Sequence, residues 1–145
     1  MSTMDRAEIS KKNPYYLPMH RYRELRHHCL QYPDWKSTYG YLLWPESASI
    51  KELFDKGCVV SSVEEAVLMR DLYLRRIQLV EDVVKKVDAD IYPWLLRGVT
   101  EELPYENLKL RYGLPMSRNA YYKRYRQFFW VLDKVLVARE EQGVY

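Results

Sequence analysis

The sequence has little of what marks several large classes of protein. It holds two cysteines, five glycines and seven prolines in 145 residues. Cys29 and Cys58 form no CxxC pair and no zinc-ligand spacing. His20, His27, His28 and Cys29 lie close together, but no matching acidic or Cys/His group follows them, so no metal site is expected. The scattered glycines and prolines argue against a low-complexity polymer, and we expect a globular chain with reduced thiols.

Long apolar runs are missing as well. The first residues lack the apolar core of a signal peptide, and no run approaches the roughly 18 apolar residues that a membrane span needs. The sequence also has no phosphate-binding glycine loop and no nucleophile elbow. We therefore expect a cytoplasmic protein that is not an enzyme, with no cofactor and no membrane partner.

Positive charge is concentrated toward the end of the chain. The formal net charge is only +3. Residues 107–127, however, carry six Lys/Arg and no Asp/Glu, whereas residues 46–106 carry eight basic and thirteen acidic residues, a balance of −5. A basic block interleaved with aromatic residues is typical of a surface that meets phosphate groups. The alternative is a solvated basic surface with no partner.

Apolar residues recur at three- and four-residue spacing, and no run is a convincing strand. We predict an all-α fold, a helical bundle with a long central helix and a C-terminal helix-turn-helix. The predicted helices are Pro18–Gln31, Asp34–Leu43, a weak one at Ile50–Lys56, Ser62–Val87, a short one from Asp90 to Gly98, Pro104–Tyr112, and one that begins near Ser117. The apolar side of the first is expected to carry Tyr22, Leu25 and Cys29, with Tyr32 just beyond it. The inward side of the last is expected to carry Ala120, Tyr121, Tyr125, Phe128, Leu132, Val135 and Leu136.

The predicted long helix has a clear start and two apolar sides. Ser62 is expected to cap the amide of Glu65, as in a capping box. A second apolar stripe needs a partner of its own, either the rest of the fold or another subunit. That stripe consists of Leu68, Leu72, Leu79 and Val83. By segments, we expect a flexible N-terminus (1–12), a helical segment (13–57) and a helix-turn-helix region (58–145), the last two forming one compact unit.

The stretch from Leu103 to Leu136 has the outline of a DNA-binding helix-turn-helix. Gly113 suits the positive φ of a helix end, Leu114 is expected to pack under the turn, and Ser117 suits a helix cap. In such a motif the start of the second helix lies in the major groove. There Arg can pair with guanine and Asn with adenine, while Lys and Tyr reach phosphates. The candidate DNA-binding residues are Lys109, Arg111, Ser117, Arg118, Asn119, Tyr122, Lys123 and Arg126.

A family resemblance points the same way. It is carried by the capped long helix, by Leu103-Pro104-Tyr105-Glu106, by Tyr112-Gly113-Leu114-Pro115 with Ser117, and by the run Tyr121–Phe128. From about Val63 onward, these features resemble the phage-encoded regulators of the RinA/ArpU type, whose C-terminal part resembles the region-4 helix-turn-helix of sigma factors. The resemblance implies transcription control, or a related DNA role, in a phage or prophage.

Together these features predict a sequence-specific double-stranded DNA-binding protein of the host-cell cytoplasm, a phage or prophage transcriptional regulator. Host RNA polymerase and a second copy of the chain are further candidate partners. Two alternatives stay open. One is a small-terminase-like DNA-packaging oligomer. The other is a phage protein that binds and inhibits a host nuclease or polymerase.

Overall fold

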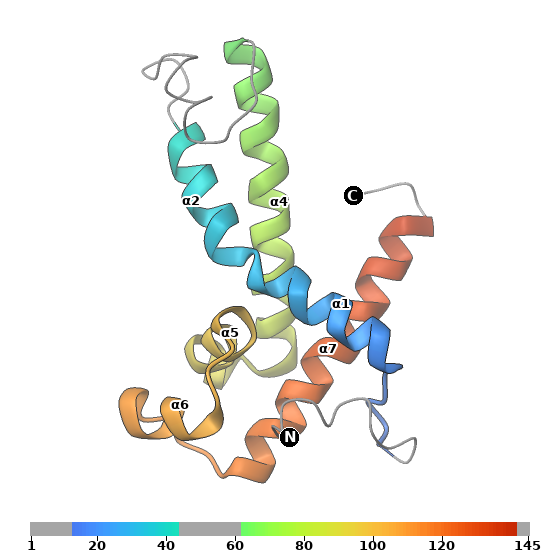
Figure 1. Ribbon diagram of the computed structural model, residues 1–145, viewed down its shortest axis with the longest axis vertical. Helices are drawn as coiled ribbons and strands as arrows, with labels where there is room; N and C mark the ends of the chain where they lie inside the picture. The colour runs from blue at the N-terminus through green and yellow to red at the C-terminus, as the bar shows by residue number, and fades with distance from the viewer. Residues whose placement is uncertain (1–12, 44–61, 142–145) are drawn as a thin grey trace. The chain divides into compact units, whose positions relative to one another are not determined.

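The computed structural model describes residues 13–43 and 62–141, and every regular element in these ranges is helical (Figure 1). The absence of strands from the described residues confirms the all-α prediction. No helix within these ranges is long and apolar enough to cross a membrane. The predicted helix at Ile50–Lys56 and the predicted flexible N-terminus lie outside the described residues. The helices are α1 (Met19–Leu30), α2 (Tyr32–Leu42), α4 (Val63–Asp88), a 3₁₀ turn (Ala89–Ile91), α5 (Tyr92–Glu101), α6 (Tyr105–Tyr112) and α7 (Arg118–Glu141).

The described residues form two compact units, and we treat each by itself. The first contains residues 13–30 and 80–141, and the second contains residues 31–43 and 62–79. This division differs from the predicted boundary between residues 57 and 58. The difference arises because α1 packs against α5 and α7, far along the chain. The periodicity of a helix indicates which side is buried, but it does not indicate which other helix covers that side.

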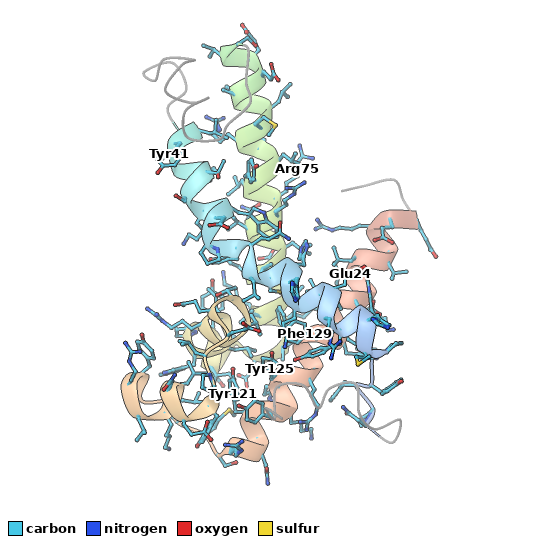
Figure 2. All side chains as sticks on the ribbon, in the orientation of Figure 1. Glu24, Tyr41, Arg75, Tyr121, Tyr125 and Phe129 are labelled. Carbon is cyan, nitrogen blue, oxygen red and sulfur yellow. The ribbon has the colours of Figure 1, made fainter. Side chains whose placement is uncertain are left out.

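The core of the first unit is built from aromatic and aliphatic side chains of α1, the last part of α4, α5, α6 and α7. Figure 2 shows the rings of Tyr121, Tyr125 and Phe129 along one side of α7. Tyr22 of α1 packs edge-on against Phe129, with ring centroids 5.3 Å apart. Cys29 of α1 is also buried here, and this burial raises the pKa of its thiol. The side of α1 predicted to be apolar is therefore the side that is buried.

The second unit is a pair of helices, α2 and the first part of α4, which lie side by side in Figure 1. Leu42 and Ala66 are fully buried between them, with Met69 and Tyr73 packed around. The guanidinium of Arg76 lies over the Trp35 ring, 6.0 Å from its centroid. These contacts place one side of α4 against α2.

Most helix ends follow the local signals in the sequence. The hydroxyl of Ser62 accepts a hydrogen bond from the Glu65 amide at 3.1 Å, which confirms the predicted cap of the long helix. Pro33 lies in the first turn of α2, where its missing N–H costs nothing. The predicted end at Gly98 is wrong, because α5 continues to Glu101 and Glu102 takes the left-handed conformation instead. Gly98 lies in the helix interior, where the Tyr121 side chain occupies the space that a Cβ would need.

Candidate nucleic-acid interface

The turn between α6 and α7 is set by local backbone chemistry. Gly113 has a φ of +67°, the left-handed conformation that glycine adopts without strain. Its N–H donates to the Lys109 carbonyl at 3.2 Å, and the next N–H, of Leu114, donates to the Leu108 carbonyl at 3.1 Å. Leu114 is fully buried beneath the turn. Ser117 then caps α7 by accepting a hydrogen bond from the Ala120 amide at 3.3 Å. The predicted roles of Gly113, Leu114 and Ser117 are confirmed.

Aromatic side chains hold this turn in place. The Tyr105 hydroxyl donates to the Met116 carbonyl at 2.7 Å, across the turn. The Tyr105 amide donates in turn to the Tyr122 hydroxyl at 3.2 Å, which ties the start of α6 to α7. At the other end of α6, the indole N–H of Trp94 donates to the Tyr112 carbonyl at 2.6 Å. Because each bond joins segments that are separate in sequence, the start of α7 is held in a defined position relative to α6.

The side of α7 opposite its buried rings carries the polar residues that the sequence placed there. Asn119 and Lys123 are exposed, and Arg126 is partly exposed. The 100° step of a helix puts these three residues on one side. We call them the outer face of α7. No hydrogen bond or ion pair joins any of the three to the rest of the described chain. Their polar groups are therefore available to a ligand.

The two cations of α6, Lys109 and Arg111, are exposed as well. Arg111 lies against the neighbouring Tyr112 ring, with its guanidinium carbon 5.4 Å from the ring centroid. Lys109 donates no side-chain hydrogen bond to any described residue. Both side chains suit a charge-only contact, in which an exposed cation meets a phosphate oxygen.

Arg118 is exposed but held by its neighbours. It forms an ion pair with the Glu106 carboxylate, and its guanidinium lies 5.4 Å from the centroid of the Tyr122 ring. The pair links the first turn of α6 to the first turn of α7. Glu106 was not among the predicted DNA-binding residues. The sequence did carry one indication of its role. Residues 107–127 contain no acidic residue, so Glu106 is the nearest carboxylate before this basic segment.

The expected outward position of Tyr122 is wrong. This residue is 5% exposed, and its ring packs edge-on against Tyr121 and Tyr125 at centroid distances of 5.2 and 5.9 Å. The seven-residue inward face predicted for α7 was too narrow, since Phe129 and Asp133 are also buried. Tyr122 therefore supports the surface that Arg118 presents, and it is not itself a surface contact.

Three interactions, one made by Arg124 and two by Trp130, lie next to the outer face of α7. Arg124 donates through Nε to the Asp88 carboxylate at 3.1 Å, so it braces α7 against the end of α4. Farther along α7, the Trp130 ring is packed by Tyr15, with centroids 6.1 Å apart. Lys134 lies over the same indole, 5.0 Å from its centroid. These contacts engage Arg124 and Trp130, so neither residue belongs to the outer face, although α7 is exposed again farther along, at Lys134 and Val137.

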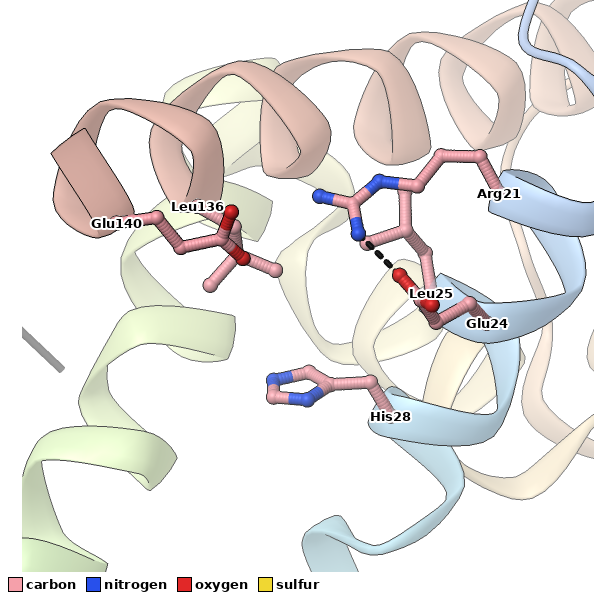
Figure 3. A pocket seen from close by; sticks show the side chains of 6 residues that line it. All are labelled: Arg21, Glu24, Leu25, His28, Leu136 and Glu140. Atoms are coloured by element: carbon pink, nitrogen blue, oxygen red, sulfur yellow. Dashed lines mark hydrogen bonds and ion pairs between the residues drawn. The ribbon is translucent and has the colours of Figure 1, made fainter.

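A pocket of about 130 Å³ lies between α1 and α7 (Figure 3). Arg21, Glu24 and His28 line it from α1, and Glu140 lines it from α7. Arg21 is paired with Glu24 there and donates through Nε to the Asp133 carboxylate at 2.6 Å. Pockets that hold small ligands enclose roughly 300 Å³ or more. This one is smaller, and its cation is already used within the protein.

The histidines of α1 do not gather around a common ligand position. His20 and His27 are exposed, while Cys29 points into the core. Within the part of the chain that the structure describes, no group of three or more His, Cys, Asp or Glu residues is placed to hold a metal ion.

No family model, curated protein or solved structure matches the chain. What the α6–α7 surface can bind is therefore inferred from its own charge and geometry.

Proposed function

We propose that this chain binds double-stranded DNA through the first turns of α7. The observation that carries the proposal is the outer face of α7, where Asn119, Lys123 and Arg126 are accessible and have no partner among the described residues. They lie in a segment, 107–127, that contains no acidic residue. Cations that are not neutralised within the protein can replace the counterions of DNA, and the release of those ions drives binding.

The position of each side chain suggests its role. We assign Arg118 and Asn119, in the first turn of α7, to contacts with base edges, because the start of a recognition helix enters the major groove. Arg pairs well with guanine and Asn with adenine. Lys123 and Arg126, together with Lys109 and Arg111 of α6, would contact phosphates. Ser117 acts through its cap, which fixes the start of the helix.

The resemblance to phage regulators supports transcription control in an infected cell as the biological role, with host RNA polymerase as a partner. The two alternatives predict different solution behaviour. A packaging protein would form a ring on DNA, whereas an inhibitor of a host enzyme would bind that enzyme and show no salt-dependent affinity for DNA.

We expect the double variant Arg118→Ala/Lys123→Ala to bind a DNA duplex about tenfold more weakly at moderate salt, because two phosphate or base contacts are lost. The slope of log affinity against log salt should become shallower by about two, since each lost cation releases about one counterion less. Fluorescence anisotropy with a labelled duplex, titrated at several salt concentrations, measures both quantities.

The matched control is Arg23→Ala/Lys86→Ala, which removes the same charge from exposed positions on α1 and α4. This control should change affinity by no more than about twofold, because distant surface charges are screened at physiological salt. Equal losses of affinity for the two double variants would show that the effect comes from net charge alone. Unchanged affinity for Arg118→Ala/Lys123→Ala would show that the first turns of α7 do not bind DNA.

Glu106 should weaken DNA binding, since its carboxylate holds Arg118 and repels phosphate. We expect Glu106→Gln to bind duplex DNA about two- to fivefold more tightly, the range that corresponds to the modest energy of an exposed ion pair. The same anisotropy titration measures this change, and Glu101→Gln on α5, paired with Arg97, is the control. If Glu106→Gln left the affinity for DNA unchanged, Arg118 would not contact DNA.

A further inference from the structure

The second unit leaves one side of α4 uncovered by the residues that the structure describes. Leu68 is 70% exposed, although it belongs to the apolar stripe that the sequence predicted to need a partner. Leu72, one turn later, is partly exposed. The residues that meet α2 are Ala66, Met69 and Tyr73, which lie on a different side of the helix.

This stripe has the spacing of a helix-packing seam, with the partly exposed Glu65 at one end and the exposed Arg75 at the other. Glu65, Leu68, Leu72 and Arg75 follow one another at intervals of three, four and three residues, which places them along one line on the helix. Figure 2 shows Arg75 on the side of α4 away from α2. Arg75 is exposed and has no ion pair within the described residues. We call these four residues the α4 seam.

We propose that the α4 seam binds the α4 seam of a second copy of this chain, with the two helices antiparallel. A twofold axis at the level of residue 70 relates residues that lie equally far from position 70 in opposite directions along α4. Leu68 then meets the second copy's Leu72, and Glu65 meets the second copy's Arg75. Because a twofold contact is reciprocal, each pairing occurs twice.

Charge complementarity singles out this occupant and this orientation. In the antiparallel arrangement both ends of the seam pair an acid with a base across the interface. A parallel arrangement would place Glu65 opposite Glu65 and Arg75 opposite Arg75, and such like-charge contacts oppose association. Two α2–α4 pairs joined in this way form a four-helix arrangement, in which the apolar side left open by a single pair becomes buried.

The dimer is inferred independently of DNA binding, and it can be tested without DNA. Sedimentation equilibrium of the full chain should show a monomer–dimer equilibrium. Glu65→Arg alone and Arg75→Glu alone each create two like-charge contacts, and each should raise the dimer Kd at least tenfold. The double variant Glu65→Arg/Arg75→Glu restores opposite charges, and its Kd should return to within about threefold of the original value. A double variant no better than the single ones would overturn the proposal.

A second pair of variants tests the apolar centre of the seam. Leu68→Glu should abolish the dimer, whereas Leu110→Glu, at an 85% exposed leucine of α6, should leave it unchanged. Both leucines are exposed, so neither substitution should disturb folding, and far-UV circular dichroism checks this. If the unsubstituted chain were monomeric at every concentration, the proposal would be wrong, and the α4 seam would bind a different partner. Loss of the dimer in both variants would also overturn it.

Discussion

Replacement of Tyr125 by alanine is expected to lower the free energy of unfolding by about 3–5 kcal/mol, the usual cost of truncating a buried aromatic side chain. Tyr125 is buried at the centre of the ring cluster of α7 (Figure 2). Its centroid lies 5.0 Å from that of Phe129 and 5.9 Å from that of Tyr122, both in edge-on contact. Alanine would leave a void where α7 packs on α1. Urea unfolding followed by circular dichroism measures the change.

The variant Tyr125→Phe separates the ring from its hydroxyl. That hydroxyl lies 3.2 Å from the Tyr22 hydroxyl, and this is the hydrogen bond that phenylalanine would lose. We expect a loss of about 1 kcal/mol, the net value of one neutral hydrogen bond. If the alanine variant proved no less stable than the phenylalanine variant, the ring cluster would not be what holds α7 in the core.

The parts of the fold that depend on near neighbours could be predicted from the sequence. The three-four spacing of Tyr22, Leu25 and Cys29 identified the buried side of α1, because helical geometry alone places these residues together. Ser62 and Gly113 identified helix ends through bonds that span only a few residues. In the candidate site, the same local rules placed Asn119 and Lys123 outward correctly.

The parts that depend on distant neighbours could not be predicted. By periodicity, Tyr122 lies at the edge of the inward face of α7. Its hydroxyl accepts a hydrogen bond from the Tyr105 amide, 17 residues earlier, which lies close because of the turn between α6 and α7. Arg124 resembles its basic neighbours in sequence, yet it is bound to Asp88, which is 36 residues away. The pairing of α1 with α5 and α7 likewise depends on tertiary packing. Local propensity carries no information on such pairings.

Gly98 lies in a helix formed by near neighbours, but the space around it is set by a distant residue, Tyr121. Its replacement by alanine is the second large effect expected. A Cβ at this position would lie 1.9 Å from the Tyr121 hydroxyl oxygen and 3.2 Å from the ring carbon that carries it. Because Gly98 lies inside α5, alanine would otherwise favour the helix by about 1 kcal/mol. We nevertheless expect Gly98→Ala to lower the free energy of unfolding by about 1–3 kcal/mol, since overpacking displaces α5 from α7. Urea unfolding measures the loss.

A double-mutant cycle with Tyr121→Phe identifies the cause. The Tyr121 hydroxyl is buried, and it makes no hydrogen bond with any described residue; burial raises its pKa. Removal of this hydroxyl should therefore cost little stability, because an unsatisfied buried polar group is lost. It also removes the closest atom to the new Cβ. Gly98→Ala/Tyr121→Phe should thus recover about half or more of the loss seen for Gly98→Ala alone, a coupling of the size found for residues in contact. Additive losses would show that Gly98 is required for a reason other than the space that Tyr121 occupies.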